Sequence, residues 1–105
     1  MVVDDEALNI EVIKSMLHEK GFECDSAWSG SQTLEKIKSR HSLVQQGKAK
    51  MYKLILMDYS LPDMEGPDVA KQARSFIRKN LSTALDRLDP VICCCTSYTA
   101  PVYMR

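Results

Sequence analysis

Short apolar runs alternate with amphipathic stretches along the chain, and this alternation predicts an α/β fold. Continuous apolar runs at residues 1–3, 54–57 and 91–95 are typical of strands that are covered on both faces of a parallel sheet. The second run lies in a strand that we expect at residues 52–57. Residues 22–27 alternate apolar and polar side chains in their first half, which predicts a strand nearer the sheet edge.

The stretches between these runs predict three helices, at residues 5–20, 32–40 and 67–79. In the first, apolar residues recur in steps of three and four and form one stripe: Leu8, Val12, Ile13, Met16 and Leu17. Gly21 is a suitable helix stop, and Pro67 suits the first turn of the third helix. We expect residues 41–50 to extend the second helix or to form a surface loop. Residues 80–89 are expected to prolong the third helix.

The order β-α-β-α-β-α-β implies a parallel sheet with right-handed crossovers. A chain of 105 residues holds one domain at most, which we expect to span residues 1–105. In open parallel sheets, ligands bind outside the carboxyl ends of the strands. The residues that end the apolar runs are therefore the first candidates for a functional site.

Carboxylates end two of the runs. Asp58 follows the central strand, and Asp4 and Asp5 follow the first. Unpaired carboxylates are costly to bury, so each should lie where its strand leaves the core. If the two strands are parallel neighbours, the three groups meet in one crevice, where they repel one another and require a cation such as Mg²⁺. Asp58 is then a possible nucleophile toward phosphoryl groups, although a simple turn or capping role for it stays open.

A resemblance to a known family rests on four features: VVDDEALN at residues 2–9, LILMD at residues 54–58, Leu61-Pro62 with Gly66, and the pair Thr96-Ser97. Together they resemble the receiver domain of two-component response regulators and hybrid histidine kinases. The resemblance runs from residue 1 to about residue 100. It implies a flavodoxin-like receiver fold with strand order 2-1-3-4(-5), in which the acidic groups meet between strands one and three.

The resemblance also implies a reaction. A partner histidine kinase or histidine phosphotransfer protein would pass a phosphoryl group to Asp58 in a Mg²⁺-dependent way. By family position, Asp5 ligates Mg²⁺ directly, Asp4 holds it through water, and the Ser60 backbone carbonyl completes the site. Thr96 would supply a switch hydroxyl to the phosphoryl oxygen, with Cys95 as the alternative because it also ends an apolar run. The domain would be a signalling phosphoacceptor that assists its own phosphorylation and dephosphorylation, and not an enzyme.

The sequence departs from the family pattern near its C-terminus. Receivers carry a Lys at the end of the fifth strand, whereas this chain stops at Arg105. We therefore expect a domain that is slightly short at its N-terminus and lacks the last helix, strand and helix, as a fragment of a longer protein such as a hybrid histidine kinase would. The fourth strand would then be an unpaired edge, and the first helix would lack a neighbour.

Composition narrows the range of partners. The formal net charge is zero, which gives no case for binding nucleic acid or anionic membranes. Neither a membrane-spanning run nor a secretory signal is present in the sequence, so we expect a cytoplasmic protein. Three consecutive cysteines, Cys93 to Cys95, do not fit a zinc knuckle, and we interpret them as small apolar residues of a buried strand in a reduced compartment.

Two other functions remain open. One is a degenerate pseudo-receiver that acts as an interaction scaffold, which the absent Lys favours and the acidic pocket disfavours. The other is a Mg²⁺-dependent phosphatase with an aspartate nucleophile. Such enzymes usually carry a second acid two residues after the nucleophile, and Ser60 at that position counts against this function.

Overall fold

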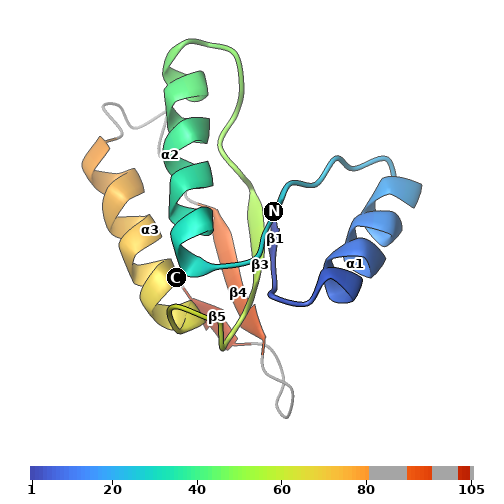
Figure 1. Cartoon of the computed structure of the whole chain (residues 1–105). Helices are drawn as coiled ribbons and strands as arrows, with labels where there is room; N and C mark the ends of the chain where they lie inside the picture. Colours follow the sequence, from blue (N-terminus) through green and yellow to red (C-terminus); the bar gives the residue numbers. More distant parts are fainter. Residues whose placement is uncertain (81–89, 96–101, 105) are drawn as a thin grey trace.

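The computed structural model describes residues 1–80, 90–95 and 102–104. Its elements follow in the order β1 (Val2–Val3), α1 (Ala7–Glu19), β2 (Ser26–Ala27), α2 (Gly30–Gln45), β3 (Leu54–Asp58), α3 (Gly66–Asn80), β4 (Val91–Cys95) and β5 (Val102–Met104). The sheet lies between two helical layers, with α2 and α3 on one face and α1 on the other (Figure 1). This is the α/β architecture expected from the alternating pattern.

The strand order is β2-β1-β3-β4-β5. The first four strands are parallel, so the predicted order 2-1-3-4 is confirmed. The register runs straight across the sheet, because Val3 pairs with Met57 and Met57 pairs with Cys94. The carboxyl ends of β1, β3 and β4 therefore lie together at one edge.

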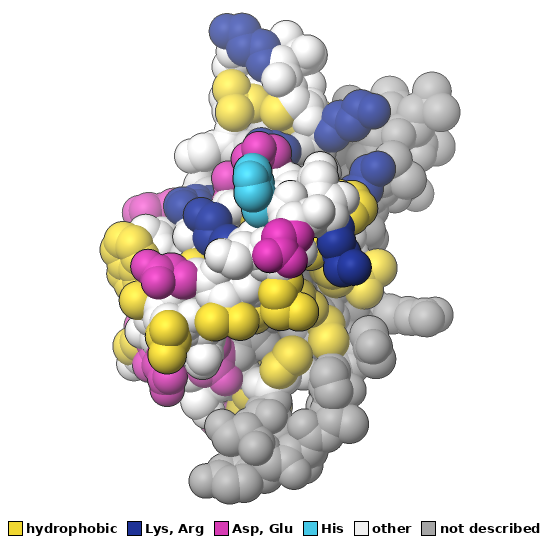
Figure 2. Space-filling model, turned by 90° about the vertical axis from the view of Figure 1, so that its right-hand side faces the viewer, with side chains coloured by type: hydrophobic (Ala, Val, Ile, Leu, Met, Phe, Trp, Pro, Cys, Tyr) yellow, Lys and Arg dark blue, Asp and Glu magenta, His cyan; other side chains and the backbone are white. Residues whose placement is uncertain are grey.

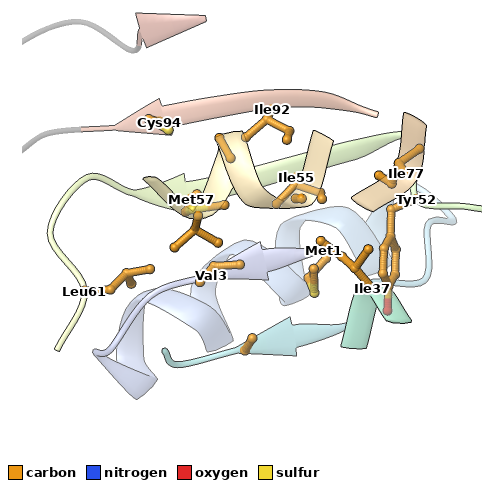
Figure 3. Packing of buried hydrophobic residues seen from close by; sticks show 14 residues of the cluster. Met1, Val3, Ile37, Tyr52, Ile55, Met57, Leu61, Ile77, Ile92 and Cys94 are labelled. Atoms are coloured by element: carbon orange, nitrogen blue, oxygen red, sulfur yellow. The ribbon is translucent and has the colours of Figure 1, made fainter. Parts of the chain in front are cut away.

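The main hydrophobic core lies between the sheet and the layer formed by α2 and α3. Ile55 and Met57 lie two residues apart on the same face of β3 and point toward these helices, where they pack with Ile37 and Ile77 (Figure 3). Ile92 of β4 belongs to the same cluster. Each of these five side chains is at most 1% exposed, so this layer supplies most of the hydrophobic stabilisation.

Helix α3 follows the predicted apolar stripe closely. Val69, Ala70, Ala73 and Ile77 are all buried against the sheet and α2. The two alanines let the helix backbone approach its neighbours, while Asp68, Lys71, Arg78 and Lys79 are exposed. None of the helices among the described residues has the length and apolarity needed to cross a membrane.

Helix α2 is longer than the range 32–40 that the sequence predicted. Ser29 caps its N-terminus by accepting a hydrogen bond from the Gln32 N–H at 3.1 Å. The helix extends past residue 40 because its inward face stays buried there. His41 is only 7% exposed, and its ring packs edge-on against that of Phe76, with the two ring centroids 5.4 Å apart. Beyond Gln45 the chain turns at Gly47, whose φ of +71° favours glycine. Residues 41–50 thus form both a helix extension and a loop.

The second strand is shorter than the predicted range 22–27. The Phe22 N–H donates to the Leu17 carbonyl at 2.9 Å, so this part of the backbone finishes the end of α1 and is not free to pair in the sheet. Phe22 is 60% exposed. The first hydrogen bond to the sheet is donated by the Val2 N–H to the Asp25 carbonyl. The strand β2 then pairs with β1 over Ser26 and Ala27, because β1 itself has only two residues.

The expectation that the fourth strand forms an unpaired edge is wrong. Residues Val102–Met104 form β5, which pairs antiparallel with β4. Cys93 lies opposite Tyr103 in this register. The antiparallel pairing with β5 hydrogen-bonds backbone groups of β4 that would otherwise have been left open.

Helix α1 differs from the other helices because none of its residues is buried. It forms at the predicted apolar stripe, yet Leu8, Val12 and Met16 are 71%, 51% and 58% exposed. Figure 2 looks onto this face, where hydrophobic side chains lie among acidic and basic ones. The helix contacts mainly β1. Its contribution to the core is therefore small.

This asymmetry predicts unequal costs of truncating apolar side chains. Ile77→Ala in the α3 layer should lower the free energy of unfolding by about 2–5 kcal/mol, because it leaves a cavity in a packed core. Leu8→Ala on α1 should cost less than about 0.5 kcal/mol, because most of that side chain already contacts water. Urea unfolding followed by circular dichroism measures both values. Equal costs for the two variants would contradict the burial pattern.

Candidate functional site

Three carboxylates meet at the carboxyl edge of the sheet. Asp58 is the last residue of β3, while Asp4 and Asp5 follow β1 directly. Because β1 and β3 are parallel neighbours, the three side chains converge, and one oxygen from each lies within 4.8 Å of the others. The structure thus brings together the acids that the strand ends suggested. Within the described residues this is the one cluster of potential metal ligands.

The cluster opens into a cleft of about 260 Å³ between β1, β3 and the first turns of α1. Asp4 and Asp58 line the cleft together with Asn9, and Cys95 at the end of β4 lines it as well. Asp58 is half-buried and Asp5 is exposed. A ligand in this cleft can therefore reach Asp58 directly from solvent.

Burial and negative neighbours together raise the pKa of the Asp58 carboxyl above its usual range. Partial removal from water has the largest effect, and the nearby charges of Asp4 and then Asp5 add to it. The backbone N–H groups of Ser60 and Tyr59 act in the opposite direction, because they hydrogen-bond to the ionised form. The ionised cluster is thus held under repulsion that a divalent cation would relieve.

Asp4 is held in place by the start of α1. One of its carboxylate oxygens accepts a hydrogen bond from the Glu6 N–H at 2.9 Å, and the other accepts one from Asn9 Nδ2 at 3.1 Å. The carboxylate is therefore tied to the start of α1, and Asp4 also lines the cleft. This double engagement orients Asp4, whereas Asp5 next to it is more exposed to solvent.

The loop after Asp58 is fixed to α2 by the carboxylate of Asp63, a residue that the sequence analysis did not single out. Asp63 accepts hydrogen bonds from the Gly30 N–H at 2.8 Å, the Ser31 N–H at 2.9 Å and the Ser31 hydroxyl at 2.7 Å. These donors at the helix N-terminus lower its pKa to about 2. No local signal could have found the contact, because its partners lie more than thirty residues away.

Comparison with known proteins decides the family. The sequence profile of the response regulator receiver domain matches residues 1–85, which is most of the chain. The chain belongs to the response regulator receiver domain family.

Several relatives of this receiver domain are signalling proteins. It is 35% identical over 79 residues to hybrid signal transduction histidine kinase L of Dictyostelium discoideum, covering 75% of this chain and 4% of that protein. It is 33% identical over 72 residues to the aerobic respiration control sensor protein ArcB of Escherichia coli, covering 69% and 8%. It is 29% identical over 80 residues to the response regulator mcs4 of Schizosaccharomyces pombe, covering 76% and 13%. The chain therefore spans only a small part of the length of these proteins.

Ser60, Thr96 and Cys95 are the remaining predicted residues of the receiver site. Ser60 lies at the expected place two residues after Asp58, in a backbone bridge with Glu65. Thr96, the predicted switch residue, lies outside the described residues. Cys95 is described and pairs with Asp58 across the β3–β4 ladder. Burial raises the pKa of the Cys95 thiol to about 11, and the neighbouring Cys93 adds to the effect.

Gly66 is required by the close approach of α3 to the strand end. Its N–H donates to the Tyr59 carbonyl, and a Cβ at this position would lie 2.6 Å from the Asp58 carbonyl oxygen. The Tyr59 N–H in turn donates to the Cys95 carbonyl at 2.7 Å. Backbone hydrogen bonds on both sides therefore fix Tyr59, the first residue of the loop.

We predict that Gly66→Ala disturbs the site as well as the fold. The added methyl group must push the Asp58 backbone away, and overpacking of this kind costs about 1–3 kcal/mol. Thermal unfolding gives the stability loss, and Mg²⁺ titration gives the effect on the acidic cluster, which should bind more weakly. Gly47→Ala is the control: it strains a positive φ but meets no atom within 4 Å, so it should destabilise without changing Mg²⁺ affinity. Unchanged Mg²⁺ affinity in both variants would contradict the prediction.

The raised pKa of Asp58 predicts that replacing its carboxylate by a neutral side chain stabilises the folded state, and that this gain in stability depends on pH. In the folded state the protonated form is favoured, so the stability it contributes is present below the ordinary carboxyl pKa and is lost as pH rises through the raised value. In metal-free buffer at neutral pH, Asp58→Asn should therefore melt higher than the wild type.

The gain should be a few degrees at most, because solvent screens much of the carboxylate, and it should vanish in acid. Thermal melts across this pH range measure it. Glu35→Gln, at an exposed site on α2, is the control and should show no such trend. A lower melting temperature for Asp58→Asn at neutral pH would count against repulsion in the cluster.

Proposed function

We propose that this receiver domain is a phosphoacceptor in a two-component phosphorelay. Asp58 takes a phosphoryl group from the phosphohistidine of a histidine kinase or histidine phosphotransfer protein, in a Mg²⁺-dependent way. The observation that carries the proposal is the convergence of Asp4, Asp5 and Asp58 at the carboxyl edge of the sheet, next to a cleft that Asp4 and Asp58 line. The names of several relatives, which include histidine kinases and response regulators, support the same role.

The donor set fits a hard divalent cation. Carboxylate and carbonyl oxygens are the ligands that Mg²⁺ prefers, and it commonly retains several waters. Asp5 and Asp58 would ligate Mg²⁺ directly together with the Ser60 backbone carbonyl. Asp4 would hold it through water, since both its oxygens already accept hydrogen bonds from the start of α1. When bound, Mg²⁺ would neutralise the cluster and the incoming phosphoryl oxygens.

The chain's own part in the transfer is positioning. A carboxylate oxygen of Asp58 attacks phosphorus in line with the N–P bond of the donor, so that a P–O bond forms as the P–N bond breaks. The electron pair of that bond returns to the imidazole nitrogen, which then takes a proton. The backbone N–H groups of Ser60 and Tyr59 stabilise the ionised carboxylate, which is the form that attacks.

The proposal places the domain as a substrate of its partner and not as an independent enzyme. The donor protein supplies the phosphoryl group, and the product carries roughly one more unit of negative charge and three new acceptor oxygens. We further propose a cytoplasmic setting, because the four cysteines of the chain are all unpaired in the structure and such thiols persist in reducing compartments. Formal neutrality gives no basis for a nucleic-acid partner.

A phosphate-independent scaffold is a second candidate, and the exposed apolar face of α1 favours it. Such a face offers a surface for protein contacts that does not need the acidic cleft. A phosphatase is disfavoured because Ser60 stands where a second acid would act. The response to a phosphoryl mimic separates the phosphoacceptor from the scaffold.

The deciding experiment combines a phosphoryl mimic with phosphotransfer. Beryllofluoride with Mg²⁺ should stabilise the wild type by about 2.7 kcal/mol at a hundredfold excess over Kd, and Asp58→Asn should abolish this gain. A phosphorylated histidine phosphotransfer protein should add one phosphoryl group to Asp58, detected by peptide mass spectrometry. Asp68→Asn, at an exposed site at the start of α3, is the matched control and should behave as the wild type. A wild type that shows neither response would refute the phosphoacceptor role and leave the scaffold.

A further inference from the structure

An open groove of about 430 Å³ lies between α2 and α3, the two helices that cover the face of the sheet away from α1 (Figure 1). Its floor is apolar and consists of Leu34, Ile37 and Phe76. Five exposed polar side chains form its rim: Lys38, Gln72, Ser75, Lys79 and Asn80. An apolar floor with a polar rim is the kind of groove that accepts an amphipathic helix. We call it the α2–α3 groove.

The α2–α3 groove follows the direction of its two helices. On α3 its lining residues recur in steps of three and four between Gln72 and Asn80. Eight residues of an α-helix span about 12 Å, so the groove extends over about two helical turns. A ligand that fills it therefore needs a run of apolar side chains of the same length.

Helix α1 carries such a run on its outer surface. Leu8, Val12 and Met16 follow one another at steps of four residues, so they share one face of the helix over about 12 Å. All three side chains are more than half exposed. Ile13 and Leu17, at the other side of the helix, are only partly exposed. The row of Leu8, Val12 and Met16, which we call the α1 stripe, is thus not what packs α1 on its own sheet.

The two surfaces carry opposite charge. Residues 4–25, which include α1 and its flanks, contain seven acidic and two basic residues. Helices α2 and α3 together contain seven Lys or Arg residues and two acidic ones. Glu11 and Glu19 each lie three residues after a member of the α1 stripe, and both are exposed. The stripe and the groove therefore match in length, in polarity and in charge.

We propose that the α2–α3 groove binds helix α1 of a second copy of this chain. The α1 stripe lies on the apolar floor, and Glu11 and Glu19 lie beside the rim lysines Lys38 and Lys79. None of the residues that line the groove lines the acidic cleft, so the contact does not depend on the phosphoacceptor function.

The contact joins two different surfaces, and these lie on opposite faces of the sheet (Figure 1). After one contact has formed, each pair of copies still presents one α1 stripe and one α2–α3 groove. A heterologous contact of this kind does not close at the dimer, so association continues to larger species.

Charge favours this arrangement over the two symmetric ones. Packing α1 against α1 would bring the acidic flanks of both helices together, and packing groove against groove would bring the rim lysines together. Like charges at an interface weaken it, whereas the head-to-tail contact pairs glutamates with lysines. A second copy is also the one acidic amphipathic helix that the chain itself supplies.

The size of the contact sets its strength. One helix in one groove falls in the class of interfaces below about 1,200 Å², which is typical of transient association. We therefore expect weak self-association that appears at high protein concentration. Because the charged groups involved are exposed, added salt should weaken it.

Sedimentation equilibrium of the 105-residue chain tests the proposal directly. At low ionic strength the average mass should rise with protein concentration and pass that of a dimer. In about 1 M salt, where the Debye length is about 3 Å, the association constant should fall severalfold.

Charge reversal tests which surfaces meet. Lys38→Glu combined with Lys79→Glu reverses the groove, and Glu11→Lys combined with Glu19→Lys reverses the flanks of the stripe. Each double variant alone should associate about tenfold more weakly than the wild type, or less still. Mixing the two double variants should restore association, because opposite charges face each other again. Restoration also shows that both variants are folded.

Lys48→Glu combined with Lys53→Glu is the matched control. Both side chains are exposed and lie outside the groove, and the net charge changes by the same amount as in the groove variant. This control should retain the association of the wild type to within about twofold.

The outcomes are distinct. Association that passes the dimer, is lost in both reversed variants and returns on mixing supports the proposal. A chain that stays monomeric at every concentration would overturn it and leave the groove to a helix of another protein. Association that stops at the dimer and persists in the groove variant would indicate α1 packed against α1, and equal weakening by the control pair would indicate unspecific attraction. Either result would also overturn it.

Discussion

Mutual repulsion among three carboxylates at one sheet edge is the constraint on which the rest of this structure depends. The parallel pairing of β1 with β3 brings Asp4, Asp5 and Asp58 together. The protein tolerates this because the groups lie at the rim of the core, where water still reaches them. Val3 and Met57, which directly precede Asp4 and Asp58, are each only 1% exposed, so an acid at either position would be buried. The position of the cluster thus reconciles stability with a site that attracts cations.

The loop that follows Asp58 shows how the chain keeps this site in one shape. Gly66 lets the start of α3 contact the strand end, and Asp63 fastens the loop to the first turn of α2. The two contacts involve different helices, so the loop is held between them. A site built in this way is pre-organised, since little ordering remains to be done when a ligand arrives.

The sequence predicted the parts of the fold that depend on local pattern. The apolar run of β3, the stripe of α3 and the acids at two strand ends each carry a short-range signal, and each appears where expected. Long-range contacts carry no such signal. The Asp63 contact with Ser31 depends on such a distant partner. The pairing of β5 with β4 and the loss of residues near Phe22 from the second strand depend instead on which backbone groups pair, which the side-chain pattern does not record. The position of Cys95 beside Asp58 required the strand register, which pattern alone left uncertain by one residue.

Asp4 and Asp5 also form the connection between β1 and α1, and this has a consequence for motion. Helix α1 has no buried side chain and contacts mainly β1, so local unfolding of this helix costs little free energy. Any ligand that bridges Asp5 to Asp58 fixes the connection from which the helix starts, and occupancy of the cleft then becomes thermodynamically linked to the order of α1. Backbone amide exchange along this helix would therefore report, at a distance of several turns, whether the cleft is filled.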